Sequence, residues 1–410
     1  ARDRVGGRAW SRRIAACTAP AELGAEFIHG PAIETKTLLR HAGLATTDVG
    51  GDSWRGEASG ELVRDETEFA EAASLFDGAR SLAGDESVDR YLKRFDDDAA
   101  MRDRVSAALA FVEGFEAADP VIASARAIAQ EWRSGVDSAV ARPREGYQPL
   151  FEYLRGASLA AGVRISLSTT VRSIAWHRGG VAVEVRDGSG ESHAIRARVA
   201  IVTLPAGVLR YRGDDAIAFV PELPESKLAA LGYIEMGHAL RAVLCFRSAF
   251  WERICDARYR DAGFFRAPGR PFSAYWTRLP VRSGLIAAWS GGPQTAELSD
   301  LSEEEVVERA LSGFGALLGE SALARREFEG GLAHDWSRDP FALGAYSYVA
   351  VGGGDARRVL GEPVDGTLFF AGEATATDGQ GGTVNGALES GERAAAEAAT
   401  ALGLAAIPKS

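Results

Sequence analysis

The last part of the chain constrains its fold more than any other stretch. Residues 367–402 read TLFFAGEATATDGQGGTVNGALESGERAAAEAATAL. This pattern predicts a short buried strand, a glycine-rich loop and a long helix rich in Ala and Glu. Backbone N–H groups at such a loop and helix N-terminus are suited to hold an anionic or electron-rich ligand group. The sequence therefore favours an α/β fold with a ligand site at this loop.

Strand and helix patterns also alternate along the rest of the chain. Residues 31–141 show mostly helical periodicity, strand patterns cover 163–188, 197–210 and much of 238–292, and a helix begins at Ser302. Single cores stop growing near about 250–300 residues, so we expect two domains. The expected boundaries are a discontinuous α/β domain of residues 1–45, 142–212 and 335–410, and a second domain of residues 46–141 and 213–334.

Charge and cysteine spacing exclude several classes of protein. The formal net charge of −11 argues against nucleic acid or an anionic membrane as a partner. No apolar run reaches the roughly 18 residues that a membrane span needs. Cys17, Cys245 and Cys255 are so widely spaced that we expect idle thiols, no disulfide framework and no metal site. A cytoplasmic protein is expected, and the sequence leaves the oligomeric state open.

Six segments carry a resemblance to a known family. They are ARDRVGGR (1–8), LGAEFIHGP (23–31), TTVRSIAW (169–176), AIVTLPAGVL (200–209), HDWSRDPFALGAYSYVAVG (334–352) and FFAGEATATDGQGGTVNGALESGERAA (369–395). In this order they resemble the flavin-containing amine oxidases of the monoamine and polyamine oxidase type. The resemblance implies a discontinuous Rossmann-like FAD-binding domain and an α+β substrate domain with a mixed sheet and helices.

The opening residues depart from that family in one respect. Its members carry G-x-G-x-x-G on the first strand–helix turn and a ribose-binding Glu just before the position of Ala1, and this sequence contains no G-x-G-x-x-G. The resemblance thus implies an N-terminally truncated chain that lacks the first βαβ unit. We expect it to bind FAD more weakly than a chain extended upstream by about 30 residues.

The resemblance also implies a set of cofactor contacts. Arginine supplies fixed positive charge for the diphosphate and ribose, glycine lets backbone amides approach the ligand, and the last helix directs its N-terminus at the flavin ring. Ala345 stands where covalent members have Cys, so FAD should be bound noncovalently; Trp336 and Tyr348 suit either flavin contact or core packing. The predicted cofactor-binding residues are Arg2, Gly6, Gly7, Arg8, Ala25, Glu26, Phe27, Val171, Trp336, Gly372, Glu373, Thr383 and Val384.

Three residues are candidates for catalysis. Tyr346 matches one of the two tyrosines that enclose the amine in monoamine oxidases, whereas Thr383 occupies the position of the other. His29 lies in the segment expected beside the flavin, where an imidazole can meet the substrate ammonium or accept its proton. Arg241 replaces the family Lys that holds a water at flavin N5, and a guanidinium cannot act as a base. The electron acceptor is therefore open.

The resemblance implies oxidation of an amine by hydride transfer to flavin N5. The imine is then hydrolysed to an aldehyde or ketone, and O2 reoxidises the flavin to give H2O2. The expected partners are a small amine and O2, with no nucleic acid or membrane. Polyamines or secondary amines are favoured because of His29 and the missing second tyrosine. L-Amino-acid oxidation, a flavin-binding protein without oxidase turnover, and a fragment without function stay as alternatives.

Overall fold

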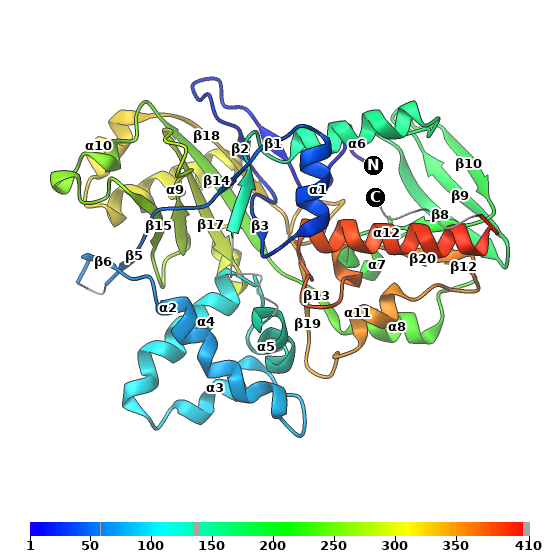
Figure 1. Cartoon of the computed structure of the whole chain (residues 1–410), viewed down its shortest axis with the longest axis horizontal. Helices are drawn as coiled ribbons and strands as arrows, with labels where there is room; N and C mark the ends of the chain where they lie inside the picture. The colour runs from blue at the N-terminus through cyan, green and yellow to red at the C-terminus, as the bar shows by residue number, and fades with distance from the viewer. Residues whose placement is uncertain (58, 134–139, 405–410) are drawn as a thin grey trace.

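The computed structural model describes residues 1–57, 59–133 and 140–404 and has a mixed α/β architecture (Figure 1). A large sheet with covering helices forms one region, a group of helices lies below it, and a second α/β region adjoins both (Figure 1). Within the described residues, none of the helices has the length and apolar character needed to cross a membrane.

The largest sheet has seven strands. Only the β15–β5 pair is parallel; the other neighbours are antiparallel. The order is β18 (Phe328–Asp335), β14 (Ala239–Phe246), β17 (Leu285–Gly291), β16 (Ala274–Trp276), β15 (Ala262–Arg266), β5 (Asp52–Gly56) and β6 (Leu62–Arg64). Helix α9 (Glu303–Leu317) packs on β14 and β18 and buries Phe314, while α10 (Ser321–Glu327) packs on α9. The predicted start of α9 at Ser302 is confirmed by a capping box with Glu305.

A helical group forms a separate core around Phe76, Tyr91 and Trp132. Its helices are α2 (Glu68–Ser74), α3 (Val88–Leu92), α4 (Arg102–Gly114) and α5 (Ala125–Arg133), with short 3₁₀ turns between them. The prediction of mostly helical structure over 31–141 holds for this group and for α1 (Ile33–His41). It is wrong where β4 (Thr46–Asp48), β5 and β6 occur, and β7 (Val140–Pro143) lies between β3 (Ile28–His29) and β4. These strands form because distant partners complete their ladders, which local periodicity does not report.

The second α/β region centres on two parallel strands, β11 (Ala200–Val202) and β20 (Leu368–Phe370). The long helix α12 (Val384–Ala401) packs on both strands, as the strand–loop–helix pattern predicts. Around them lie two further sheets, made of β13 (Ile234–Met236) with β19 (Ser347–Val349), and of β10 (Ser192–Ala197), β9 (Gly180–Arg186), β8 (Thr170–His177) and β12 (Ala218–Val220). The helices here are α6 (Gln148–Ala160), α7 (Ala206–Arg210), α8 (Glu225–Gly232) and α11 (Ala356–Gly361).

Segments from opposite ends of the chain pack together in this region. Helix α1 lies against α12, where Thr35 bonds Asn385 in a buried contact. The strands β1 (Ser11–Arg12) and β2 (Ala21–Glu22) form a hairpin that leads into residues 23–25. The α/β region is thus assembled from sequence segments hundreds of residues apart.

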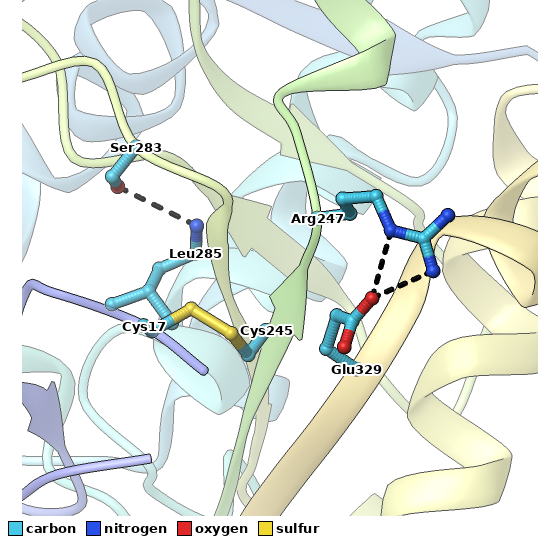
Figure 2. The surroundings of a disulfide bond; sticks show 6 residues. All are labelled: Cys17, Cys245, Arg247, Ser283, Leu285 and Glu329. Carbon is cyan, nitrogen blue, oxygen red and sulfur yellow. Dashed lines mark hydrogen bonds and ion pairs between the residues drawn. A yellow bond between two sulfur atoms is a disulfide. The ribbon is translucent and has the colours of Figure 1, made fainter. Parts of the chain in front are cut away.

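The cysteines correct one expectation from the sequence. Cys17, on the loop between β1 and β2, forms a disulfide with Cys245 of β14, 228 residues away (Figure 2). Cys255 is free and exposed. The expectation of three idle thiols is therefore wrong, because wide spacing in sequence does not prevent two cysteines from meeting in the fold. Disulfides occur mainly in oxidising compartments, so this bond gives the expected cytoplasmic location no support.

Candidate active site

A hollow opens at the carboxyl ends of the parallel strands β11 and β20. Its lining includes Arg8, Thr203, Gly372 and Glu373. In open α/β sheets this end of the strands is where ligands bind, because the loops that follow the strands diverge there. The residues brought together come from the start of the chain, from the segment that follows β11 and from the segment that follows β20.

Backbone segments approach closely beside this hollow. Gly6 and Gly7 adopt positive φ angles of 99° and 57°. Ala25 N–H donates to the carbonyl of Arg8 at 3.1 Å, and a Cβ atom on Gly24 would lie 1.8 Å from that same oxygen. Only glycine fits at position 24, so residues 6–9 and 23–25 form one rigid wall.

Glu373 is an acidic residue in the lining of the hollow, and its carboxylate accepts several hydrogen bonds. Its carboxylate accepts from Arg8 Nη1 at 2.8 Å, Ser347 Oγ at 2.6 Å and Gly382 N at 3.1 Å. Although burial acts to raise its pKa, Arg8 and Arg357 hold the pKa of Glu373 below its ordinary value. Glu373 is therefore ionised and fixed at the foot of the loop that precedes α12.

The N-terminus of α12 faces the same region. Thr383 caps the helix by accepting from Gly386 N at 2.9 Å, so its hydroxyl is used within the helix. Val384 and Ala25 pack on the same hydrophobic cluster. The structure thus brings the predicted residues Ala25 and Val384 to one cluster.

Arg241 is buried in the middle of β14 and bonded to Glu26. Arg241 Nη1 donates to Gly24 O at 2.9 Å and Nη2 donates to Glu26 Oε2. Arg142 Nη1 lies 2.8 Å from Glu26 Oε1, and Trp276 Nε1 donates to Oε2 at 3.0 Å. The Arg241 guanidinium also lies over the Trp276 ring, 4.9 Å from its centroid. Both carboxylate oxygens of Glu26 therefore already have partners among the protein side chains.

The face of the sheet around Arg241 is aromatic. Its cross-strand neighbours are Trp289 on β17 and His334 on β18, which share its side of the sheet. His334 packs edge-on against Trp336, whose Nε1 donates to Leu23 O at 2.8 Å. Trp336 is 2% exposed, so it forms part of the wall behind residue 23.

Tyr346 and His29 both contact Phe115. Tyr346 Oη donates to Phe115 O at 2.5 Å, and the Tyr346 ring stacks with Trp289 at 6.5 Å and 9°. The His29 ring packs edge-on against Phe115 at 5.6 Å. The two residues predicted to meet the substrate therefore converge on the segment around Phe115.

An acidic pair adjoins Tyr346. Burial, and then the charge of Glu131, raise the pKa of Glu116 to about 8, and Trp132 Nε1 donates to it at 2.6 Å. Arg357 Nη2 lies 3.2 Å from Glu131. Glu116 is therefore held protonated near neutral pH, and Arg357 balances the charge of Glu131 when that group ionises.

Two predicted residues lie further from the hollow or are already paired. Arg2 is bonded to Asp339 by two contacts of 2.8 and 2.7 Å. Val171 begins β8 and packs on the cluster that contains Val202 and Phe370. Tyr348 is buried in the helical core, as the packing alternative allowed.

Sequence analysis missed several residues of the site. Local patterns gave no sign of their partners, although a buried arginine in the apolar strand β7 is itself an unusual feature. The missed residues are Glu116, Glu131, Arg142, Trp276, Ser347 and Arg357. Among the residues that the structure describes, no group of three or more His, Cys, Asp or Glu side chains could hold a metal ion.

Comparison with known proteins gives one family. The chain matches the family profile described as "Flavin containing amine oxidoreductase" over residues 1–78 and 80–399. It is 26% identical to polyamine oxidase 4 of Oryza sativa subsp. japonica, covering 97% of this chain and 82% of the relative. It is 30% identical to lysine-specific histone demethylase 1 homolog 3 of Arabidopsis thaliana, covering 65% of this chain but only 16% of that protein.

Solved structures agree on the fold. Wild-type putrescine oxidase bound to putrescine superimposes with a TM-score of 0.77 at 22% identity, over 98% of this chain and 92% of that chain. The superposition confirms the expected fold in its mixed α/β character.

This chain covers only 27–30% of the length of several other histone demethylase homologues.

Proposed function

This chain belongs to the flavin-containing amine oxidoreductases, and on that premise we propose that it is an FAD-dependent amine oxidase. Membership makes it an oxidoreductase that acts on amines. In the proposed reaction the C–N bond loses two electrons and two protons, and water splits the imine into a carbonyl compound and an amine. O2 takes up the two electrons and two protons as H2O2.

The observation that carries this proposal is the ion pair of Arg8 and Glu373 in the hollow at the carboxyl ends of β11 and β20. Nothing lies within 4 Å of a Cβ atom built on Gly372, so the loop leaves open space where a ligand can approach the backbone. A fixed cation, a fixed anion, glycine backbone and the N-terminus of α12 are the donor set that a dinucleotide needs. The chemistry of these groups supports the proposal of a flavin dinucleotide at this loop.

We assign the parts of the site as follows. Arg2, Gly6, Gly7, Arg8, Gly372 and Glu373 hold the dinucleotide chain, with Val171 on its adenine side. Ala25, Glu26, Phe27, Trp336, Thr383 and Val384 surround the ring. The N–H groups at the start of α12 favour negative charge on the ring edge that they face. The Rossmann-like FAD-binding domain would then comprise residues 1–45, 142–212 and 335–410, and the substrate domain 46–141 and 213–334.

Noncovalent attachment of FAD follows from the same positions. Ala345 is buried, and its carbonyl oxygen accepts from Arg8 Nη1 at 2.9 Å. Cys17 and Cys245 are joined to each other, and Cys255 is exposed. No cysteine thiol in the described part of the chain is thus placed to bond the cofactor.

When bound, the cofactor would supply the two-electron acceptor that takes up a hydride, and the protein orients the amine and excludes water. We assign proton acceptance from the substrate ammonium to His29, since a neutral amine is the form that is oxidised. Tyr346 and Trp289 form an aromatic wall for the carbon chain. Arg241 provides a fixed cation that favours electron transfer to O2 without changing its own protonation.

Polyamines or secondary amines are the favoured substrates. The matched relatives include a polyamine oxidase, and Thr383 stands where monoamine oxidases carry their second tyrosine. The L-amino-acid alternative needs an arginine for the substrate carboxylate. Arg142 and Arg278, both buried, are already bonded to Glu26 and to backbone carbonyls, so they give it no support.

The test is optical. Purified chain incubated with FAD and then desalted should be yellow, and an anaerobic panel of polyamines, secondary amines, primary monoamines and L-amino acids should bleach it with some amines only. Air should restore the colour and produce H2O2. Yellow protein that no amine bleaches would contradict the proposed enzyme.

A second candidate is a flavin-binding protein without oxidase turnover. The observation that favours it is the bonding of Arg241 to Glu26, since the guanidinium is already engaged. If the protein is an inert binder, no amine bleaches it. If it is a dehydrogenase, an amine bleaches it but air does not restore the colour at a useful rate. An artificial electron acceptor then distinguishes a dehydrogenase from an inert binder.

A further inference from the structure

Glu26 joins two arginines from different elements. Its Oε1 is 2.8 Å from Arg142 Nη1 on β7, and its Oε2 accepts from Arg241 Nη2 on β14. The three side chains are only 3–4% exposed. The stability of ion pairs that are shielded from water depends strongly on their geometry, because water cannot replace a lost partner.

All three groups are charged together. Burial acts to raise the pKa of Glu26, but Arg241, Arg142 and Arg278 lower it to about 2. A guanidinium keeps its proton in proteins. Two cations and one anion leave the trio with a net charge of +1. This charge is constant across the pH range in which the protein works.

The contacts of Arg241 fix its orientation. One nitrogen donates to Gly24 O at 2.9 Å and the other to Glu26, while the guanidinium lies over Trp276. A planar fork held at two nitrogens and stacked on one face has little rotational freedom. The carboxylate of Glu26 is held in turn by Arg142 and by Trp276 Nε1.

We propose that Glu26 is a positioning residue whose carboxylate, anchored by Arg142, holds the Arg241 guanidinium in one orientation at the ring site. This inference rests on the proposed function, since it assigns Arg241 a part in electron transfer to O2. It separates two roles: Arg241 supplies the positive charge, and Glu26 fixes the orientation of the guanidinium that carries it. The three residues then act as one unit.

The decisive variant keeps the net charge of +1 and removes the carboxylate that orients Arg241. In E26Q/R142M the carboxylate and one arginine are both lost, so the net charge of +1 stays on Arg241 alone. E26Q by itself leaves two adjacent buried cations and should lower the unfolding midpoint of the flavin-free chain by roughly 5 °C or more. The double variant should recover most of that loss because the repulsion is gone.

Glu22 offers a matched control. It is a second buried glutamate, four residues earlier, and it is bonded to Ser11 rather than to Arg241. E22Q should leave the rate of reoxidation close to that of the parent, and it should raise rather than lower the unfolding midpoint of the flavin-free chain at neutral pH, because glutamine needs no proton. The comparison separates loss of any buried carboxylate from loss of the one that orients Arg241.

The expected result is that E26Q/R142M is reoxidised by O2 about 10-fold more slowly than the parent and loses less in its rate of reduction by amine. Parental reoxidation in this variant would overturn the inference and leave the proposed function standing. So would an E26Q midpoint in the flavin-free chain no lower than that of the parent. A parent chain that no amine bleaches overturns the proposed function and this inference with it.

Discussion

Arg8 donates a 2.8 Å hydrogen bond to Glu373, and this ion pair joins the first turn of the chain to the loop before its last helix. Arg8 also donates to Ala345 O, and Glu373 also accepts from Ser347. One contact therefore ties together three segments that are remote in sequence. It lies at the end of the parallel strands where a dinucleotide is expected.

Substitution Arg8→Met should weaken both the fold and the cofactor site. Glu373 would keep Ser347 and the more distant Arg357, so we expect a loss of about 1–3 kcal/mol in unfolding free energy. FAD affinity should fall at least about 10-fold, measured by fluorescence titration. Arg358→Met is the control, since Arg358 forms only exposed pairs on α11. Equal FAD affinity in the Arg8 variant and the parent would show that Arg8 is structural only.

The imidazole of His29 is tested by His29→Asn. Asparagine keeps a polar side chain but cannot accept a proton, so amine reduction should slow about 10-fold or more while the unfolding midpoint moves little. Stopped-flow reduction and thermal unfolding are measured on the same samples. His41→Asn, at the exposed end of α1, is the control. A stability loss that matches the loss of rate would assign His29 to packing with Phe27 and Phe115.

The disulfide should lower the number of thiols that can be titrated in the unreduced chain by two. The denatured, unreduced chain should show one thiol, from Cys255, and three after reduction. Replacing both Cys17 and Cys245 with Ala should cost about 2–5 kcal/mol, because the bond closes a long loop in the unfolded chain. Cys255→Ala is the control. Three thiols before reduction would contradict the bond.

The division between what the sequence predicted and what it did not follows the range of the interactions. The strand, loop and helix at 367–402 and the start of α9 at Ser302 depend on neighbours within a few residues, and their prediction is confirmed. The disulfide and the contact of Arg142 with Glu26 depend on contacts between residues more than 100 positions apart. No periodicity records such contacts. Family resemblance gave the segment containing Glu26 but not the partners of its side chain.

Glu22 should make stability depend on pH. Burial raises its pKa from 4.5 to about 7, so the folded chain keeps a proton that the unfolded chain releases. The stability from this group is complete below pH 4.5 and is lost as pH rises through 7, by on the order of 3 kcal/mol. Glu22→Gln should flatten that slope in chemical denaturation between pH 5 and 8. An unchanged slope would mean that another group titrates.

Arg241 should affect one half-reaction more than the other. Reduction depends on how the amine is aligned, whereas electron transfer to O2 gains from a nearby cation as negative charge develops. Arg241→Met removes the cation and leaves Glu26 paired with Arg142, so the fold should survive while reoxidation slows about 10-fold or more and reduction changes less. Arg241→Lys keeps the charge and should keep or improve oxygen reactivity. Stopped-flow traces of both half-reactions decide between these outcomes. If Arg241→Met is reoxidised as fast as the parent, the buried guanidinium serves only the packing of β14 against residues 24–26.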